Sequence, residues 1–312
     1  MHRPFTRLML SGLCAAMLLL SACGSNNAGG NTSNACASTR TIDGKNLVVG
    51  GKLDPEAQLL TKMYTLLLRK AGFTVTEKAK LGTNTIVFSA ICSGQIDVYP
   101  EFTATGLGKL GDTTSHNAQQ DYQTVKTAYE SKYHLTWLDV APMNDTYGIC
   151  TTQAVAQKYN LTKMSDLIAV AKNLKVATPP DGQTDPGALT LWKSAAGYGL
   201  NFKKEDVLDE AVTFTSVQNG QDDLNVCYTT IGFISADNFV LLQDDKSVTP
   251  AYNPAPLIRQ DTLAKSPNIA TALNPLAPLL TTAAITKLNA AVANGGSITD
   301  VATQFLQQQG LF

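Results

Sequence analysis

Several aromatic side chains stand at or near the ends of segments that the sequence predicts as strands. Phe102 follows one such strand, and Tyr228 ends another. Tyr147 lies at the first expected crossing between the two halves, and Tyr252 lies within the proline-containing segment 249–254. Open α/β sheets bind their ligands outside the ends of strands, so these four rings are placed to converge on one cleft. A quaternary ammonium group offers no hydrogen-bond donor, but ring faces can hold it, with about 0.5–2 kcal/mol per contact. The pattern fits a cation cage, and it fits ordinary packing of strand-end aromatic residues as well.

The inventory of catalytic side chains argues against an enzyme. Beyond the first residues the chain has two histidines, His116 and His134, and neither lies in a motif that pairs it with a nucleophile. The sequence has no Gly-x-Ser-x-Gly, no His-Glu-x-x-His and no phosphate-binding glycine loop. The acidic pair Asp244-Asp245 precedes Lys246 and is typical of a solvated turn. We therefore expect no catalytic site and no cofactor; an envelope enzyme is the less favoured alternative.

The N-terminal residues have the form of a bacterial lipoprotein signal. Arg3 and Arg7 precede an apolar run, and Ser21-Ala22 precedes Cys23. We expect removal of residues 1–22 and lipidation of Cys23, which would anchor the protein outside the cytoplasm at a membrane surface. A cleaved signal with an incidental cysteine is the alternative, and it also exports the protein. The polar stretch that follows, within residues 23–43, is expected to be a flexible tether.

Four further cysteines fall in a part of the chain that export would place in an oxidising compartment. They are Cys36, Cys92, Cys150 and Cys227. Three pairings are possible. We favour 36 with 92, which flank the first βα unit, and 150 with 227, which lie in two later strand-like segments. The alternative is that each is a small buried apolar residue. No Cys-x-x-Cys or Cys/His spacing indicates a metal site.

Overall composition excludes one class of partner. Charged residues make up 16% of the 312 residues, and the formal net charge is −1. A nucleic-acid-binding protein would show a basic face, which this chain lacks. The length suits two lobes of ordinary size or one large domain.

From Asn46 onward, short β-rich segments alternate with helical patterns, which is typical of α/β layering over a largely parallel sheet. The predicted strands are 46–50, 73–78, 96–99, 135–139, 175–177, 212–214 and 224–228, with a proline-rich strand within 241–252. The predicted helices are 55–71, 84–94, 113–132, 153–159, 165–172 and 186–199, one that ends at Gly220, and a helical tail over 262–312.

A repeated phrase indicates two similar halves. Residues 93–98 and 219–224 each combine a helix-terminal glycine, a polar turn with aspartate and the start of a strand, although any such turn favours these residues. We expect lobe I to comprise 44–143 together with 236–312, and lobe II to comprise 144–235. The hinges are then expected near 141–147 and 229–237.

Several segments together resemble the glycine betaine/carnitine/choline (osmoprotectant) substrate-binding proteins of ABC importers. They are Val48–Lys52, Glu56, Leu81–Asn84, Gly94–Gly106, Asn144–Tyr147, Cys227–Thr230 and Leu242–Lys246. The resemblance runs in order over about residues 46–312. It implies a type II periplasmic-binding-protein-like fold, with two α/β lobes joined by two hinge crossings that close on a solute. It also implies a monomeric receptor that delivers the solute to a membrane permease with its ATPase.

The same resemblance implies a set of ligand-binding residues. The family's aromatic cage falls on Phe102, Tyr147, Tyr228 and Tyr252, and its Asp-Thr-Tyr segment adds Asp145. In relatives, a lysine after the first strand and a threonine can meet the ligand carboxylate. These positions are Lys52 and Thr105 here.

Three departures from the family pattern leave the ligand open. Phe102 replaces the usual tyrosine, Ile231 replaces an aspartate, and residues 179–187 lack the arginine that relatives often have. Asp181 or Asp185 near the cleft would weaken carboxylate binding and favour choline or another non-acidic cation, or would be a plain loop acid. A different small polar or aromatic ligand is the alternative within the same fold.

Overall fold

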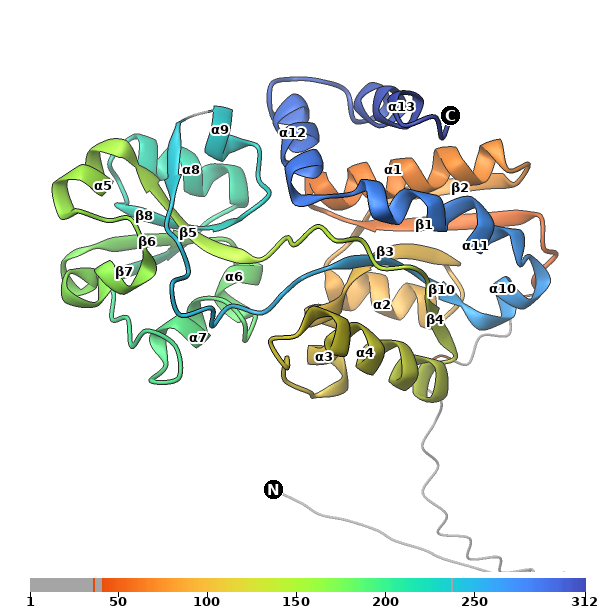
Figure 1. Ribbon diagram of the computed structural model, residues 1–312, viewed down its shortest axis with the longest axis horizontal. Helices are drawn as coiled ribbons and strands as arrows, with labels where there is room; N and C mark the ends of the chain where they lie inside the picture. The colour runs from red at the N-terminus through yellow and green to blue at the C-terminus, as the bar shows by residue number, and fades with distance from the viewer. Residues whose placement is uncertain (1–35, 37–40, 237) are drawn as a thin grey trace, which may run out of the picture. The chain divides into compact units, whose positions relative to one another are not determined.

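The computed structural model describes residues 36, 41–236 and 238–312, which contain two five-stranded sheets flanked by helices (Figure 1). The predicted signal, Cys23 and most of the predicted tether lie outside the described residues. Disulfides join Cys36 to Cys92 and Cys150 to Cys227, the pairing favoured by their positions in the sequence.

The first sheet has the order β2-β1-β3-β10-β4, and its one reversed strand is β10. Its strands are β1 (Asn46–Lys52), β2 (Thr74–Gly82), β3 (Val98–Phe102), β4 (Leu135–Trp137) and β10 (Pro254–Arg259). The proline-rich strand predicted within 241–252 is therefore wrong in position. The one proline in that stretch, Pro250, lies in a connecting segment, and the strand begins at Pro254.

Helices cover both faces of the first sheet (Figure 1). One face carries α1 (Pro55–Lys70), α11 (Asn268–Leu273), α12 (Thr282–Ala293) and α13 (Ile298–Gln308). The other carries α2 (Asn84–Cys92), α3 (Thr103–Leu110) and α4 (Ala118–Tyr133). The remaining helical elements of this part of the chain are α10 (Gln260–Lys265) and the 3-10 helix η3 (Asn274–Leu279). Helix α1 begins as expected, because the Asp54 carboxylate accepts a hydrogen bond of 2.7 Å from the Ala57 amide.

Helix α3 was not predicted, because glycines interrupt its sequence. At Gly106 the glycine serves packing rather than a turn, since an added Cβ would lie 2.7 Å from the Trp137 ring. Among the described residues, no single helix is long and apolar enough to cross a membrane. Residues 268–279 and 282–293 meet that requirement together, as a pair bent by 93°.

The second sheet has the order β7-β6-β8-β5-β9, and its one reversed strand is β5. Its strands are β5 (Tyr147–Thr152), β6 (Lys175–Thr178), β7 (Lys204–Val207), β8 (Leu224–Tyr228) and β9 (Phe239–Leu241). In both sheets the reversed strand, β5 or β10, occupies the fourth position and is the first strand after the chain crosses from the other sheet.

The helical elements around the second sheet correct several predictions. They are α5 (Gln153–Tyr159), η1 (Met164–Ala169), η2 (Ala171–Asn173), α6 (Pro180–Thr184), α7 (Leu189–Lys193), α8 (Glu210–Gln218) and α9 (Phe233–Ala236). The strand predicted at 212–214 is wrong: those residues lie in α8, which buries Phe214 and Val217 on one face. The helix predicted over 186–199 shrinks to α7, and the one over 165–172 is two 3-10 turns.

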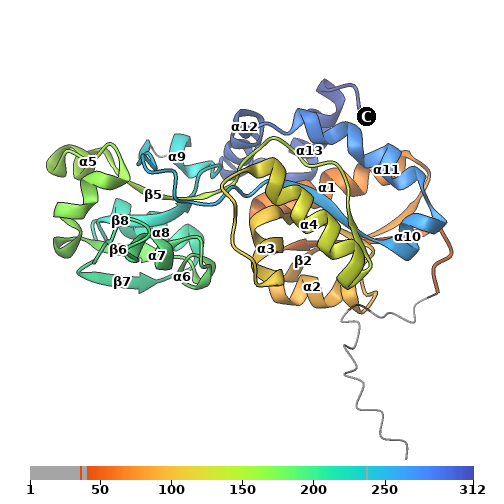
Figure 2. The same cartoon turned by 60° about the horizontal axis from the view of Figure 1, so that its bottom comes forward.

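Two segments connect the sheets and run side by side (Figures 1 and 2). The amide of Asp145 donates to the Tyr252 carbonyl at 3.0 Å, and the Tyr252 amide donates to Asn144 Oδ1 at 2.7 Å. The first segment includes the predicted hinge at 141–147. The second hinge, expected at 229–237, is wrong, because β9 returns the chain to the second sheet before it crosses over residues 242–253.

Candidate functional site

A cavity of about 530 Å³ receives side chains from both sheets and from the connecting segments. All seven residues expected to contact a ligand line it. They are Lys52, Phe102, Thr105, Asp145, Tyr147, Tyr228 and Tyr252. Strand ends supply Phe102, Tyr147 and Tyr228, and a connecting segment supplies Tyr252.

Strand register brings the four rings together. Tyr147 begins β5 and Tyr228 ends β8, and these two residues are direct partners in the antiparallel pair. Their ring centroids are 4.8 Å apart, and their hydroxyl oxygens lie 3.2 Å from each other. Phe102 is the direct partner of Pro254 in the β3–β10 pair. Pro254 follows Tyr252 by two residues in the chain. The Tyr252 ring meets the Tyr147 ring edge-on at 5.5 Å.

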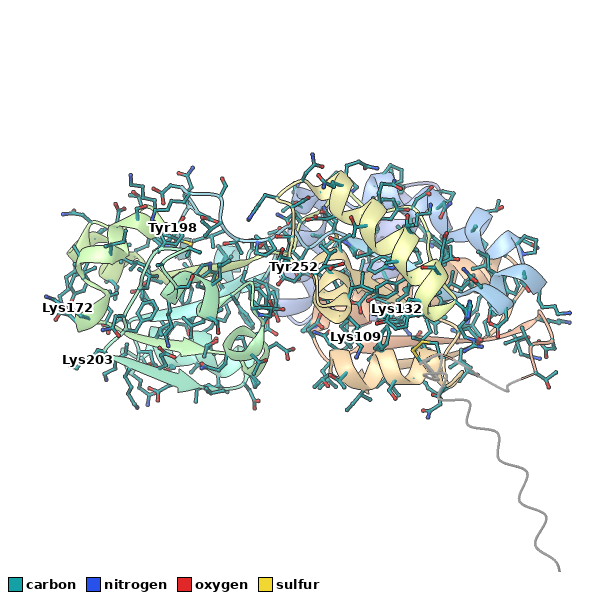
Figure 3. All side chains as sticks on the ribbon, turned by 90° about the horizontal axis from the view of Figure 1, so that it is seen from below. Lys109, Lys132, Lys172, Tyr198, Lys203 and Tyr252 are labelled. Carbon is teal, nitrogen blue, oxygen red and sulfur yellow. A yellow bond between two sulfur atoms is a disulfide. The ribbon has the colours of Figure 1, made fainter. Side chains whose placement is uncertain are left out.

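Tyr252, which is labelled in Figure 3, lies on the second connecting segment, and its hydroxyl group binds a residue that lies between β6 and β7. Its hydroxyl donates to Asp185 Oδ1 at 2.6 Å, and the Gly187 amide donates to the same carboxylate oxygen at 2.8 Å. Glycine is required at 187, because an added Cβ would lie 2.8 Å from the Tyr252 hydroxyl oxygen. Asp185 is thus a partner of the tyrosine, and Asp181 lines the cavity itself.

Lys52 is already paired. Its ammonium lies 2.6 Å from Glu101 Oε1 and 4.9 Å from the centroid of the Phe102 ring, and both Lys52 and Glu101 are buried. Glu101 also accepts hydrogen bonds from the Phe102 amide at 2.9 Å and from the Tyr99 hydroxyl at 2.7 Å. The family resemblance implied that Lys52 would be a partner for a ligand carboxylate, whereas in the structure the Lys52 ammonium is paired with the carboxylate of Glu101.

Two carboxyl residues lie at the cavity wall, and only one of them, Asp145, was among the residues expected to contact a ligand. Glu56 from α1 and Asp145 both line the cavity. Asn289 donates to Glu56 Oε2 at 2.6 Å, and the Thr230 hydroxyl donates to Asp145 Oδ1. Burial raises the pKa of both carboxyls, and the charge of Asp145 raises the pKa of Glu56 further. Glu56 belongs to the segments that carry the family resemblance, which gave it no role.

Four more carboxyl groups line the cavity, and among the described residues that line it Lys52 is the only basic one. The four are Asp54, Asp181, Asp209 and Glu210. Burial raises the pKa of Glu210 to about 8, with further contributions from the charges of Asp54, Asp145 and Asp181. Across residues 36, 41–236 and 238–312, no group of three or more His, Cys, Asp or Glu side chains is arranged to hold a metal ion.

A second cavity of about 730 Å³ shares Asn84, Thr105 and Tyr252 with the first. Asp185 and the exposed His116 line it. The other histidine discussed above, His134, follows α4 with a φ of 55°. Neither histidine lies in the cavity that contains the aromatic rings.

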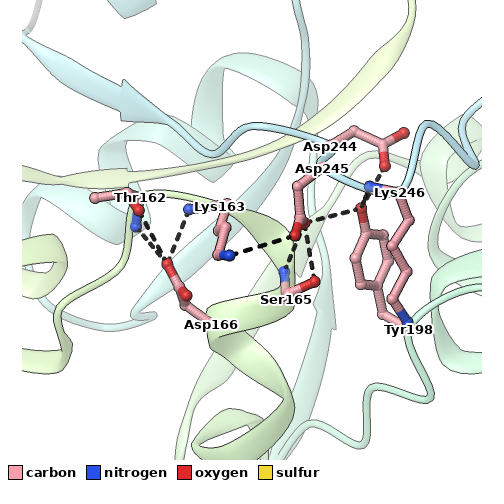
Figure 4. A network of polar contacts seen from close by, with 8 residues as sticks. All are labelled: Thr162, Lys163, Ser165, Asp166, Tyr198, Asp244, Asp245 and Lys246. Atoms are coloured by element: carbon pink, nitrogen blue, oxygen red, sulfur yellow. Dashed lines mark hydrogen bonds and ion pairs between the residues drawn. The ribbon is translucent and has the colours of Figure 1, made fainter.

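Asp244 and Asp245 take part in a network of hydrogen bonds, rather than forming only a solvated turn as the sequence indicated (Figure 4). The Tyr198 hydroxyl donates to both carboxylates, and Ser165 donates to Asp245 Oδ1 from its hydroxyl at 2.9 Å. Asp244 Oδ2 accepts from the Thr249 amide at 2.8 Å. Burial opposes ionisation of Asp244, but these hydrogen bonds prevail and lower its pKa. The network fixes the segment that carries Tyr252.

The chain is similar to known transport proteins over nearly all of its described length. The family described as "Substrate binding domain of ABC-type glycine betaine transport system" matches residues 45–308. A glycine betaine-binding protein, YehZ, of Escherichia coli is 33% identical over 276 residues, covering 84% of this chain and 90% of the relative. The carnitine transport binding protein OpuCC of Listeria monocytogenes is 27% identical over 318 residues, covering 100% and 99%.

Comparison with solved structures supports the same relationship. Apo YehZ from Escherichia coli matches with a TM-score of 0.66 at 32% identity, covering 86% of this chain and 99% of that chain. A structure described as a glycine betaine/carnitine/choline ABC transporter matches with a TM-score of 0.71 at 22% identity, covering 85% and 99%, and supports the fold alone. The fold is that of type II periplasmic binding proteins, as predicted.

Proposed function

This chain belongs to the family of substrate-binding domains of ABC-type glycine betaine transport systems, and we propose that it is an extracytoplasmic receptor that captures a quaternary ammonium solute for import. Its partners in this role are a membrane permease and an ATPase. The protein itself binds and releases the solute without changing it chemically.

One observation carries the choice of ligand chemistry. Four aromatic side chains that are far apart in sequence, Phe102, Tyr147, Tyr228 and Tyr252, line a single cavity. Quaternary ammonium groups are recognised by aromatic faces, because they cannot donate hydrogen bonds and lose little hydration on entering such a site. Packing alone does not require these rings to border a cavity of about 530 Å³, a size typical of small-molecule sites.

Ligand capture would proceed by closure of the two sheet-bearing parts about their connecting segments. Phe102 comes from the first sheet, whereas Tyr147 and Tyr228 come from the second. A ligand that contacts both sides stabilises the closed state by its difference in affinity for the two states. The permease would then recognise the closed form.

A lipid on Cys23 would keep the receptor at the membrane. Replacement of Cys23 by serine should move the protein from the membrane fraction to the soluble fraction, while ligand binding persists. Retention of the C23S protein in the membrane fraction would contradict this anchor.

Thermal denaturation with a ligand panel tests the receptor assignment. Glycine betaine, choline, carnitine, proline betaine and ectoine form the panel, and at least one quaternary ammonium compound should raise the Tm. A ligand at about 100 times its Kd stabilises the folded state by about 2.7 kcal/mol. No response to any member would favour the alternative of a different small polar or aromatic ligand.

A further inference from the structure

Helix α12 links the two sheet-bearing parts in addition to the two connecting segments. Around its start, the Met143 amide donates to the Leu280 carbonyl at 2.9 Å, and the Asn144 amide donates to the Thr282 hydroxyl oxygen at 3.0 Å. Farther along, α12 packs against α1 of the first part and against α9, which lies between β8 and β9 of the second sheet. One helix therefore contacts the first connecting segment and both of the parts that it joins.

The side chain of Asn289 on α12 joins the two parts by hydrogen bonds. Its Nδ2 donates to Glu56 Oε2 on α1 at 2.6 Å and to the carbonyl oxygen of Thr230, just after β8, at 2.9 Å. The two protons of the side-chain amide thus serve one part each. The Thr230 hydroxyl donates in turn to Asp145 on the first connecting segment. Asn289 is only 8% exposed, so loss of these bonds would leave buried acceptors without a donor.

Close backbone packing occurs at the same place. An added Cβ at Gly232 would lie 2.6 Å from both the Cα and the backbone nitrogen of Ala290 on α12. A side chain cannot approach backbone atoms so closely, so glycine is needed for the segment after β8 to lie against the helix. We call these contacts of Asn289 and Ala290 with Thr230 and Gly232 the α12 junction.

The α12 junction lies beside one of the aromatic rings. Tyr228 ends β8, two residues before Thr230, and both residues line the cavity together with Asn289. The strand end that presents Tyr228 is therefore held by a helix of the other part. Phe102 belongs to that other part, so the junction restricts the movement of Tyr228 relative to Phe102. Without such contacts, relative motion of the two parts is the ordinary expectation.

We propose that Asn289 is a positioning residue, which acts with Gly232 to hold the two parts in the arrangement in which the four rings line one cavity. The arrangement is a property of the free protein, so the inference rests on the proposed function only for its effect on ligand binding. When the binding-competent arrangement is less populated, the apparent Kd rises in proportion.

Hydrogen–deuterium exchange on the ligand-free full chain in detergent tests the junction. Asn289→Ala removes both hydrogen bonds, whereas Asn294→Ala changes an exposed asparagine just after the same helix. In N289A we expect about fivefold faster amide exchange, which corresponds to about 1 kcal/mol, in residues 229–236 and in the second connecting segment, 242–253. Exchange in α13 should stay unchanged, and N294A should exchange like the original protein throughout.

The response of residues 242–253 separates the proposed role from a local contact. The hydrogen bonds of Asn289 Nδ2 go to Glu56 and Thr230 and not to this segment, so its exchange changes only if the two parts move relative to each other. Faster exchange confined to α12 and residues 229–236 would overturn the inference.

Gly232→Ala acts on the junction from the other part and decides the question if N289A fails to fold. The added methyl group forces residues 229–236 away from α12, so the same two segments should exchange faster. Gly108→Ala is the matched control, because an added Cβ there meets no atom within 4 Å. Unchanged exchange of residues 242–253 in G232A would contradict the inference.

Calorimetry with glycine betaine and choline measures the consequence for binding. Whichever of the two binds the original protein should show a Kd about fivefold higher in N289A and in G232A, but not in N294A or G108A. An unchanged Kd would contradict the positioning role. If no quaternary ammonium compound binds the original protein, the proposed function is rejected, and the exchange data still decide whether the junction holds the two parts.

Discussion

The ammonium of Lys52 at the end of β1 lies 2.6 Å from Oε1 of Glu101 in β3, in a pair buried from solvent. The same Glu101 carboxylate accepts a hydrogen bond from the backbone amide of Phe102. The ion pair therefore links two neighbouring strand ends and holds the backbone of Phe102, one of the four aromatic residues that line the cavity. We attribute a structural role to Lys52 on this basis.

Lys52→Met should destabilise the protein strongly, because it leaves the Glu101 charge buried without its cation. Loss of one partner of a buried pair typically costs about 3–5 kcal/mol. Urea denaturation of K52M measures the change in the free energy of unfolding. The exposed pair Lys193–Glu205 provides the matched control: Lys193→Met should cost less than about 1 kcal/mol.

A double variant separates charge from packing. In K52M/E101Q no uncompensated charge remains, so its loss of stability should be smaller than the sum of the two single losses. If the loss of stability in the double variant equalled the sum of the two single losses, the buried ion pair would not be the cause of the destabilisation.

Tyr228→Ala should weaken binding of the tightest quaternary ammonium ligand by about 30-fold, which corresponds to about 2 kcal/mol for one desolvated cation–π contact. Tyr228→Phe keeps the ring face and loses only the contact with the Tyr147 hydroxyl, so its effect should be much smaller. Tyr159→Ala removes a tyrosine on α5 outside the cavity and should leave the Kd unchanged. Calorimetry gives all three values; a larger loss in Y228F than in Y228A would contradict a role for the ring face.

The positions of the four aromatic residues at or near strand ends, together with the family resemblance, predicted that they would lie close together, and all four line the same cavity. Tyr147 and Tyr228 are strand partners, a relationship that follows from pairing β5 with β8. The reversed strand β10 was harder to predict. Prolines at 254 and 256 obscure its strand pattern, and its pairing with both β3 and β4 depends on contacts distant in sequence.

The contacts of the polar residues in and beside the cavity could mostly not be predicted from the sequence. Glu56 lies in the first turn of α1, where an acidic residue is ordinarily explained by the helix dipole. Only the tertiary structure brings it to Asn289, 233 residues away. Likewise, Glu101 gave no sign in the sequence of being the partner of Lys52. The strand predicted at 212–214 is wrong because these β-branched and aromatic residues lie in helix α8, where Thr213 and Phe214 are buried and Val212 is exposed.

Removal of the Cys150–Cys227 disulfide should lower stability with little effect on ligand affinity. The bond closes a loop of 77 residues, for which chain entropy corresponds to about 4.5 kcal/mol. Cys150 and Cys227 lie on adjacent paired strands, so the sheet hydrogen bonds still hold β5 against β8 in the variant. We expect C150S/C227S to unfold at a lower urea concentration, with a Kd within about threefold of the original protein. A large loss of affinity in the folded variant would show that the disulfide positions Tyr147 or Tyr228.

Ligand affinity should rise with pH. Burial raises the pKa of Glu210 to about 8, and it also raises the pKa values of Asp145 and Glu56, so part of this carboxyl cluster is protonated in the free protein at neutral pH. Binding of a cation favours the ionised carboxylates and therefore releases protons. The Kd of a cationic ligand should fall between about pH 6 and pH 9. Calorimetry in buffers of different ionisation enthalpy counts the protons released.

The stability of the free protein should decrease as the pH rises, whereas its ligand affinity should increase. A carboxyl group whose pKa is raised by folding contributes stability below its unfolded pKa, and that contribution is lost as the pH rises through the folded pKa. The Tm of the free protein should therefore fall as pH increases toward about 8, while the ligand-induced increase in Tm grows. Glu210→Gln should flatten the upper part of both profiles, and Glu130→Gln should leave them unchanged, because Glu130 does not line the cavity. An affinity that stays constant or falls with increasing pH would contradict direct coupling between these carboxyl groups and a bound cation.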